Sequence, residues 1–326
     1  MVDAATPLFE IASLSIDFRT RNGLVRAVNN VSFRLDHEEI LGLVGESGSG
    51  KTITMLASVG LINDPNAIIT GSIRYKGREL LGLPTRALQK VRGREIAMIF
   101  QDPMTAMTPV YTIGWQIMEQ LRAHMDLSRK AARTRAIELL DLMGISEPRR
   151  QFGRYPHQLS GGMRQRAMIA MALSCNPSML IADEPPTALD VTVQAQILSL
   201  LDRLRHEFKS SIIVITHDMG VVAELADRVM VMYAGRLVET ATKQQIFTVP
   251  GHPYTRGLLA AIPPMDGVKP RRLMAIPGAP PSPADMPPGC AFAPRCPQCF
   301  EPCGVPPALF QHDAHGIACY LAAQVP

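Results

Sequence analysis

A glycine-rich segment near the N-terminal end has the residue types and spacing that bind the phosphates of a nucleotide. Residues 45–52 read Gly-Glu-Ser-Gly-Ser-Gly-Lys-Thr and match the pattern G-x-x-x-x-G-K-[ST]. The segment follows the apolar run Ile40–Val44 and opens a helical pattern, which is the context that a phosphate loop requires. Glycines let the backbone turn its N–H groups toward phosphates, and a helix N-terminus attracts their charge.

The residues of this loop divide into backbone donors and two side chains with defined chemistry. The expected donors are Gly45, Glu46, Ser47, Gly48, Ser49 and Gly50. We expect Lys51 to reach the β- and γ-phosphates and the Thr52 hydroxyl to ligate Mg²⁺. An accidental glycine-rich turn would lack the flanking strand and helix, so the sequence predicts nucleotide binding. The pattern is shared by kinases, GTPases and transport ATPases.

Two carboxylates follow a second apolar run. Asp183 and Glu184 come after Met179–Ala182, and the carboxyl ends of buried parallel strands form the edge where ligands bind in open α/β folds. Asp183 suits the Mg²⁺ shell, and Glu184 suits polarising the attacking water. Since an Asp-Glu pair is also common at the start of a solvated loop, these roles depend on the rest of the pattern.

Residues 159–166, Leu-Ser-Gly-Gly-Met-Arg-Gln-Arg, precede a helical run and predict a second anion-binding helix N-terminus. Ser160 is a typical N-cap residue, followed by Gly161 and Gly162. Here the sequence resembles the ATP-binding subunits of ABC transporters, over roughly residues 8–250. In that family Leu-Ser-Gly-Gly is the signature that caps the nucleotide held by the opposite subunit.

The resemblance implies roles for further residues. Gln101 matches the Q-loop glutamine, which contacts Mg²⁺ and couples to the membrane domain, and His217 matches the switch histidine that holds the γ-phosphate. Asp190, in Ala-Leu-Asp, matches the D-loop. Phe18 stands where the family stacks an aromatic ring on adenine, although it also continues a strand alternation and could be a core residue. Pro186 departs from the family, which usually has threonine after Asp-Glu-Pro.

The C-terminal part indicates one branch of the family. Met163, where most members have glutamine, is common in the peptide-importer branch. Residues 252–259 and 288–296 resemble the C-terminal extension of oligopeptide/dipeptide importer ATPases, over about residues 252–320.

Five of the six cysteines gather near the C-terminus. In a cytosolic protein such a cluster indicates metal binding more than a disulfide framework. Several thiolates suit a soft metal centre. The resemblance implies a [4Fe–4S] cluster whose ligands are Cys290, Cys296, Cys303 and Cys319. Cys299 is the alternative third ligand. Tetrahedral zinc and free thiols are the alternatives.

These segments need a framework that positions them. Residues 9–35 alternate apolar and polar around Asn22-Gly23, which predicts antiparallel strands, whereas continuous apolar runs such as Ile212–Thr216 predict buried parallel strands. The predicted fold class is α/β: a P-loop NTPase core of the ABC ATPase type with an antiparallel β subdomain, a helical subdomain at about residues 102–165, and a small Cys-containing extension. The predicted domains are residues 1–250 for nucleotide binding and 251–326 for the extension.

Length and composition limit the class of protein. The 326 residues suffice for one large domain and a smaller piece. A net charge of +4 on scattered basic residues, with 5% aromatic residues, does not support nucleic-acid binding. No apolar run approaches the ~18–20 residues that cross a bilayer, and the N-terminus lacks a signal-peptide pattern. We expect a peripheral subunit at the cytoplasmic face of the inner membrane.

Together the motifs and the resemblance imply an ATPase that powers an ABC importer of di- or oligopeptides or a similar solute. Glu184, His217 and Lys51 are the expected catalytic residues. The expected partners are a second ABC ATPase subunit, a paralogue in preference to a second copy, two integral-membrane permease subunits and, indirectly, an extracytoplasmic solute-binding protein. The alternatives are a soluble ABC ATPase that acts in DNA repair or translation, and an ATP-regulated iron–sulfur sensor.

Overall fold

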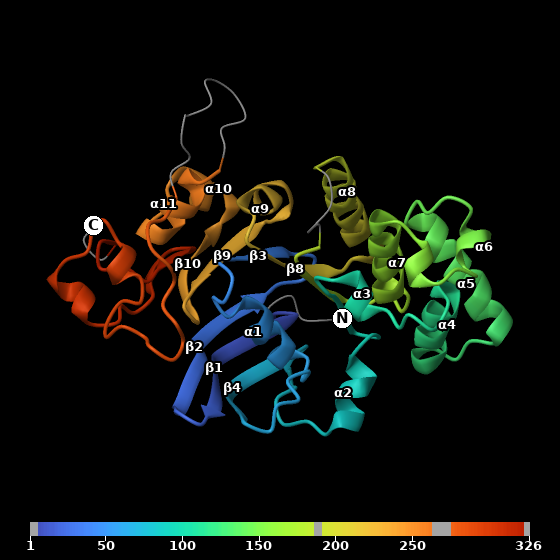
Figure 1. Ribbon diagram of the computed structural model, residues 1–326, viewed down its shortest axis with the longest axis horizontal. Helices are drawn as coiled ribbons and strands as arrows, with labels where there is room; N and C mark the ends of the chain where they lie inside the picture. The colour runs from blue at the N-terminus through green and yellow to red at the C-terminus, as the bar shows by residue number, and fades with distance from the viewer. Residues whose placement is uncertain (1–5, 186–190, 263–274, 323–326) are drawn as a thin grey trace. The chain divides into compact units, whose positions relative to one another are not determined.

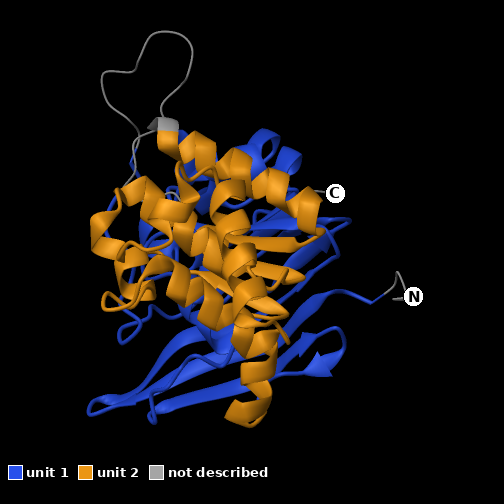
Figure 2. Ribbon diagram, turned by 90° about the vertical axis from the view of Figure 1, so that its right-hand side faces the viewer, with its two compact units in different colours: residues 1–81, 216–326 blue, residues 82–215 orange. Residues whose placement is uncertain are grey.

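The computed structural model describes residues 6–185, 191–262 and 275–322. The chain divides into two compact units, one formed by Met1–Leu81 with Thr216–Pro326 and the other by Gly82–Ile215 (Figure 2). The predicted boundary between residues 250 and 251 falls inside the first unit. That division into domains stays a prediction.

The first unit contains the N-terminal strands, the phosphate loop and the C-terminal region. Its elements are β1 (Phe9–Thr20), β2 (Gly23–Leu35), β3 (Ile40–Val44), α1 (Lys51–Ser58), β4 (Ala67–Tyr75), β5 (Arg78–Glu79), α9 (Met219–Leu225), β9 (Arg228–Tyr233), β10 (Arg236–Thr242), α10 (Lys243–Thr248), α11 (Pro253–Ala260), the 3₁₀ helices η2 (Ala293–Arg295) and η3 (Glu301–Gly304), β11 (Phe310–His312) and β12 (His315–Ile317).

The predicted antiparallel strands are confirmed. β1 and β2 form a hairpin in which Thr20 pairs with Gly23, and β1 also pairs with β4, so the sheet order is β2-β1-β4-β5 (Figure 1). The alternation of apolar and polar residues buries one face of the hairpin through Leu14, Ile16 and Val31. The two-residue turn is Arg21-Asn22, one residue before the predicted Asn22-Gly23, and Gly23, with φ +117°, is the first residue of β2.

A second sheet of the first unit positions the phosphate loop. β3 pairs in parallel with β9, and the antiparallel neighbours β10, β12 and β11 continue the order β3-β9-β10-β12-β11. All five residues of β3 are buried, as expected for a strand covered on both faces. The phosphate loop leaves the carboxyl end of β3 and leads into α1.

The second unit contains the other motifs. Its elements are α2 (Thr85–Val91), β6 (Ile96–Ile99), α3 (Pro103–Ala106), α4 (Ile113–His124), α5 (Arg129–Leu142), α6 (Pro148–Gln151), the 3₁₀ helix η1 (Pro156–Gln158), α7 (Gly161–Leu173), β7 (Met179–Asp183), α8 (Val191–Phe208) and β8 (Ser211–Thr216).

In the second unit β6, β7 and β8 run parallel, with β7 in the middle. Ile99 lies opposite Ala182, and Asp183 lies opposite Ile215, so the carboxyl ends of these strands meet at one edge. Between β6 and β7 the chain forms helices and no strand. This confirms the predicted helical content. Gln101 follows β6, and Ser160 precedes α7 within the helical segment.

The α/β fold class is therefore confirmed, with an antiparallel sheet, a helical segment and a C-terminal part that holds five of the six cysteines. Within the described residues of the C-terminal part beyond α11, the helices are short 3₁₀ turns, since proline removes the N–H donors that a long helix needs. No helix among the described residues is both long enough and apolar enough to cross a membrane.

Candidate functional site

The phosphate loop has the backbone shape that phosphate binding requires. Gly45, Gly48 and Gly50 adopt φ +155°, +79° and +99°, values that favour glycine. A Cβ on Gly45 would lie 2.2 Å from the Met232 carbonyl oxygen, so no larger residue fits there. Gly50 precedes α1, whose N-terminus is capped by no side chain. A helix N-terminus of this kind attracts an anion such as a phosphate.

Lys51 lies at the centre of the loop and is buried, with 6% of its surface exposed. Its Nζ donates to the carbonyl oxygens of Gly45 at 2.7 Å and Glu46 at 2.9 Å, and to Ser49 Oγ at 3.3 Å. The ammonium group is therefore held inside the curve of the loop. Thr52 follows Lys51 in α1 and is exposed.

The outer side of the loop is held by residues that sequence reasoning missed. Arg295 donates to both carboxylate oxygens of Glu46, from Nη1 at 2.6 Å and from Nη2 at 3.0 Å. The Glu46 backbone N–H donates to the hydroxyl of Tyr254 at 2.8 Å. Both residues lie in the C-terminal strings that carried the family resemblance, but no local signal connects them with a loop more than 200 positions away.

In the second unit the structure brings two predicted site residues into contact. Gln101 Nε2 donates to Glu184 Oε2 at 2.6 Å, although the residues are 83 positions apart. Asp183 is buried at the end of β7, with 4% of its surface exposed, and Glu184 follows it with φ +47°. The two carboxylates and the amide thus lie at the carboxyl edge of β6 and β7, as the sequence predicted for an edge that binds ligands.

The signature segment also has its predicted local structure. Ser160 caps α7, because its Oγ accepts a hydrogen bond from the backbone N–H of Met163 at 3.3 Å. Ser160 is exposed, and Gly161 and Gly162 are half-buried. The next turn of α7 is tied to the segment after Glu184, since Gln165 Nε2 donates to the carbonyl oxygen of Pro185.

The remaining predicted residues are placed as follows. His217 is exposed directly after β8, and Asp218 then caps α9 by accepting from Gly220 N at 2.7 Å. Phe18 is half-buried in β1, where it pairs with Val25 and Ala67. Asp190 and Pro186 lie outside the described residues.

Four of the predicted metal ligands gather in the C-terminal region. Cys290, Cys296, Cys303 and Cys319 interact electrostatically with one another, and the backbone N–H of Cys290 donates to the Cys303 carbonyl at 2.9 Å. Burial is the main cause that raises the pKa of Cys290, Cys296 and Cys319. No group of three or more His, Cys, Asp or Glu side chains in the described part of the chain is arranged to hold a metal ion. The structure therefore does not support the predicted [4Fe–4S] ligand set.

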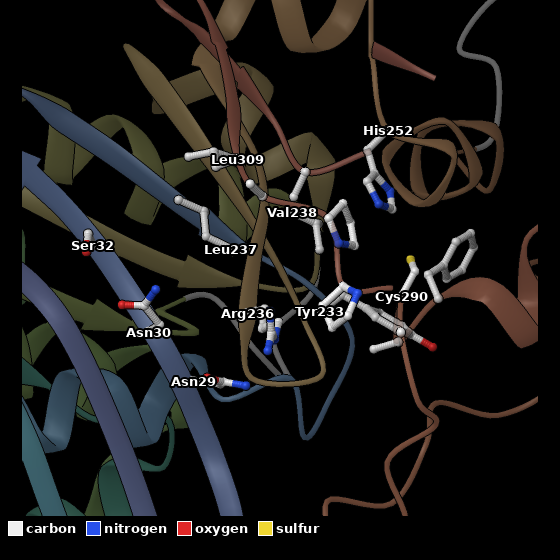
Figure 3. A pocket seen from close by; sticks show the side chains of 17 residues that line it. Asn29, Asn30, Ser32, Tyr233, Arg236, Leu237, Val238, His252, Cys290 and Leu309 are labelled. Carbon is white, nitrogen blue, oxygen red and sulfur yellow. The ribbon is translucent and has the colours of Figure 1, made fainter. Parts of the chain in front are cut away.

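Cys290 instead lines a cavity of about 300 Å³ in the first unit (Figure 3). The cavity has polar groups from β2, including Asn29 and Asn30, and side chains from β9 and β10, including Tyr233 and Arg236. Residues of the C-terminal region, including Phe292 and Leu309, complete its lining. Cys299 is exposed, in contrast to its neighbours.

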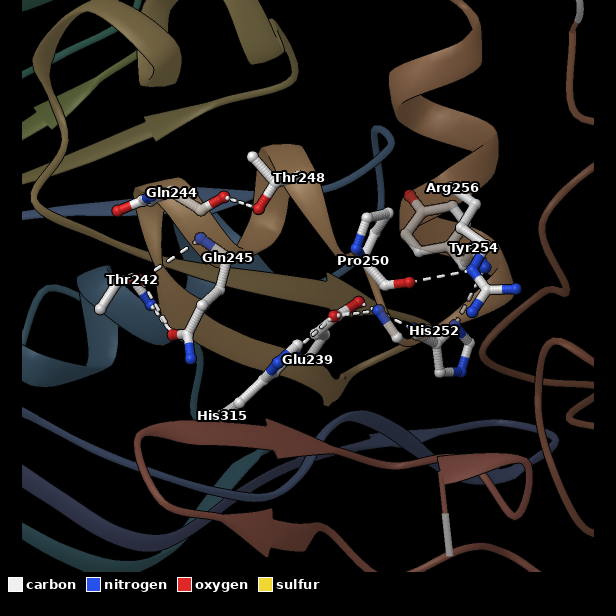
Figure 4. A network of polar contacts seen from close by, with 11 residues as sticks. Glu239, Thr242, Gln244, Gln245, Thr248, Pro250, His252, Tyr254, Arg256 and His315 are labelled. Atoms are coloured by element: carbon white, nitrogen blue, oxygen red, sulfur yellow. Dashed lines mark hydrogen bonds and ion pairs between the residues drawn. The ribbon is translucent and has the colours of Figure 1, made fainter. Parts of the chain in front are cut away.

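A buried carboxylate ties the C-terminal region to the second sheet of the first unit (Figure 4). Glu239 of β10 accepts from the backbone N–H groups of Gly251 and His252 at 2.6 and 3.0 Å, and it contacts His315 Nε2 at 2.7 Å. His252 then caps α11, with Nδ1 accepting from Tyr254 N at 3.0 Å. Burial lowers the pKa of His252 to about 4. This network fixes the start of α11 and so places Tyr254.

Comparison with known proteins adds independent evidence. Residues 28–187 match the family model "ABC transporter", and residues 238–303 match "Oligopeptide/dipeptide transporter, C-terminal region". A putative peptide import ATP-binding protein of Brucella melitensis is 56% identical over 290 residues, covering 89% of this chain and 87% of the relative. The oligopeptide transport ATP-binding protein OppD of Haemophilus influenzae is 49% identical over 320 residues, covering 98% of each chain.

Among solved structures, the ATP-binding cassette MJ0796, in a dimeric post-hydrolysis state bound to ADP and Pi, superposes with a TM-score of 0.65. It is 28% identical, and the match covers 72% of this chain and 98% of that one. The two matched segments include the phosphate loop and most of the C-terminal region described above. The chain therefore belongs to the ABC transporter family, and its C-terminal region to the family of oligopeptide/dipeptide transporter C-terminal regions.

Proposed function

We propose that this chain is the ATP-binding and ATP-hydrolysing subunit of an importer for peptides. The observation that carries the proposal is the phosphate loop with Lys51 held at its centre, in a chain whose relatives at about half identity are named as peptide import or oligopeptide transport ATP-binding proteins. The alternatives of a repair or translation ATPase and of an iron–sulfur sensor have no such support.

The proposed roles follow the motifs. Lys51 binds the β- and γ-phosphates, Thr52 and Asp183 hold Mg²⁺ together with Gln101, and Glu184 polarises the attacking water. His217 contacts the γ-phosphate, and Phe18 stacks on adenine. The contact between Gln101 and Glu184 supports the assignment, since it puts the proposed Mg²⁺-shell amide beside the proposed base.

The signature at Ser160, Gly161 and Gly162, together with Asp190, acts on the nucleotide of a second ATPase subunit. The dimeric state of the related cassette structures supports this arrangement. We propose a paralogous ATPase as the partner, with two permease subunits in the membrane and a solute-binding protein outside. The chain then works as a peripheral subunit at the cytoplasmic face of the inner membrane.

ATP hydrolysis by the assembled transporter tests the catalytic role. Glu184→Gln keeps the shape and hydrogen bonding of the side chain but removes the carboxylate that polarises water, so we expect ATP binding to persist while hydrolysis is lost. Lys51→Ala is expected to lose binding itself. Near-normal hydrolysis by the Glu184→Gln transporter would remove Glu184 from the mechanism.

We also propose that the cysteine cluster takes up a metal group, a [4Fe–4S] cluster or, as the alternative, a tetrahedral zinc ion. The gathering of Cys290, Cys296, Cys303 and Cys319 in one region supports this proposal. Metal analysis and the visible absorption spectrum of the native protein test it. Cys290→Ser should remove the bound metal, and Cys299→Ser, at the exposed cysteine, should retain it. If the native protein contains no metal, the proposal is wrong and the cysteines are free thiols.

A further inference from the structure

The C-terminal region contacts the phosphate loop through Arg295 and Tyr254, which both bind Glu46. We call these contacts the clamp. Arg295 and Glu46 form a bidentate pair in which 5% of the arginine side chain and 29% of the glutamate side chain are exposed. Arg295 is oriented by two further contacts, from Nη1 to the Tyr233 hydroxyl at 3.2 Å and from Nε to the Pro277 carbonyl at 2.9 Å. Charge-assisted bidentate pairs are among the strongest and most directional side-chain contacts.

The clamp also acts on the backbone of the loop. The Glu46 N–H donates to Tyr254, while the Glu46 carbonyl accepts from Lys51 Nζ at 2.9 Å. Both sides of this residue are therefore held, one by the C-terminal region and one by the lysine expected to bind phosphate. The ring of Tyr254 is buried, and its centroid lies 4.6 Å from that of the Tyr233 ring and 5.4 Å from that of the Phe292 ring. The hydroxyl has little freedom to leave its position.

The charge of Glu46 gives the clamp an electrostatic role. A carboxylate in the loop that receives the phosphates would repel their negative charge if nothing neutralised it, and such repulsion is strong where water is partly excluded. Arg295 supplies one positive charge to both oxygens. Removal of Arg295 would leave this half-buried carboxylate unneutralised in the loop that is proposed to bind the phosphates.

We propose that Arg295 and Tyr254 are positioning residues for ATP binding, through which the C-terminal region holds the phosphate loop in its binding shape and neutralises Glu46. This inference rests on the proposed ATP binding. It assigns to the C-terminal region a part in nucleotide affinity, separate from any metal group and from contact with other subunits.

A double-mutant cycle on the full chain tests the inference, with the Kd for Mg·ATP measured by titration calorimetry. Arg295→Gln should raise the Kd about tenfold, equivalent to about 1.4 kcal/mol. The Kd of Glu46→Gln alone completes the cycle. Adding Glu46→Gln to Arg295→Gln should restore most of the affinity that Arg295→Gln loses, because the unpaired carboxylate is gone. A merely structural role of Arg295 would make the double variant no better than Arg295→Gln.

Two further variants separate this inference from general damage. Tyr254→Phe keeps the packed ring but removes the acceptor of the Glu46 N–H, and it should also raise the Kd. Arg256→Gln is the matched control, since Arg256 lies in the same region and donates to the Pro250 carbonyl at 2.9 Å without a described hydrogen bond to the loop. It should bind ATP like the wild type.

The outcomes also separate this inference from the proposed function. Failure of the wild-type chain to bind Mg·ATP would contradict the proposed function. Wild-type binding with an unchanged Kd for Arg295→Gln would contradict the clamp alone, and thermal melting of each variant shows that it is folded.

Discussion

At the scale of single residues, His252 links the stability of the first unit to pH. It is buried, and burial lowers its pKa to about 4 from an ordinary value near 6.5. The unfolded chain therefore binds more protons than the folded chain between these values. The stabilisation is complete above pH 6.5 and is lost as the pH falls toward 4, by on the order of 3 kcal/mol.

Urea unfolding between pH 7 and pH 4 measures this loss. His252→Asn keeps a side-chain acceptor for the N-terminus of α11 but does not titrate. The variant should lose much less stability than the wild type over this range. Equal losses in both proteins would show that His252 is not the group responsible.

Gly45 is the residue where the shape of the phosphate loop tolerates no side chain. An added Cβ would lie 2.2 Å from the Met232 carbonyl oxygen and 2.8 Å from Ser49 Oγ, so Gly45→Ala must displace the loop. We expect its Kd for Mg·ATP to rise about tenfold or more, since strain of this kind costs about 1–3 kcal/mol. Gly23→Ala, at φ +117° in the hairpin turn with nothing within 4 Å, is the control for backbone strain alone. It should bind ATP normally.

At the scale of elements, α5 and α7 offer a matched pair of N-caps in the second unit. Ser128 accepts from Ala131 N at 3.2 Å, and Ser160 accepts from Met163 N at 3.3 Å. Replacing either serine by alanine should cost about 1 kcal/mol of stability. Only Ser160→Ala should strongly reduce ATP hydrolysis by the assembled transporter, because only Ser160 is proposed to contact a nucleotide.

Thermal melts and hydrolysis rates of these two variants decide between a cap and a binding role. A similar loss of hydrolysis in both would mean that Ser160 acts only through the helix. The two helices are comparable because both pack buried apolar faces within the second unit. A loss of helix stability should therefore have similar consequences in both variants.

At the scale of the whole molecule, the chain carries one complete phosphate loop and a signature segment that we propose acts on the nucleotide of another subunit. Hydrolysis should therefore need a second ATPase subunit. The Glu184→Gln chain, mixed with its partner subunit and Mg·ATP, should form a dimer that is stable in gel filtration and dissociates with Mg·ADP. A chain that hydrolyses ATP at the same rate per molecule at all concentrations, without a partner, would contradict this expectation.

Much of this protein could be predicted from local sequence. The phosphate loop is one continuous strand, loop and helix, so the order of residues 40–58 predicts these elements, and the structure places β3 and α1 there. Ser160 was recognised as an N-cap because capping depends only on the next three residues. The buried strands β7 and β8 were found because both of their faces are covered by protein.

Tertiary structure alone decided which distant residues meet. Gln101 contacts Glu184 because β6 and β7 are neighbours in register, and no local pattern states that register. Arg295 meets Glu46 across 249 positions because the Glu239 network and the packed aromatic rings place the C-terminal region against the loop. The cysteines show the same limit: their number suggested a metal site, but the arrangement of thiols in space depends on packing that their spacing does not encode.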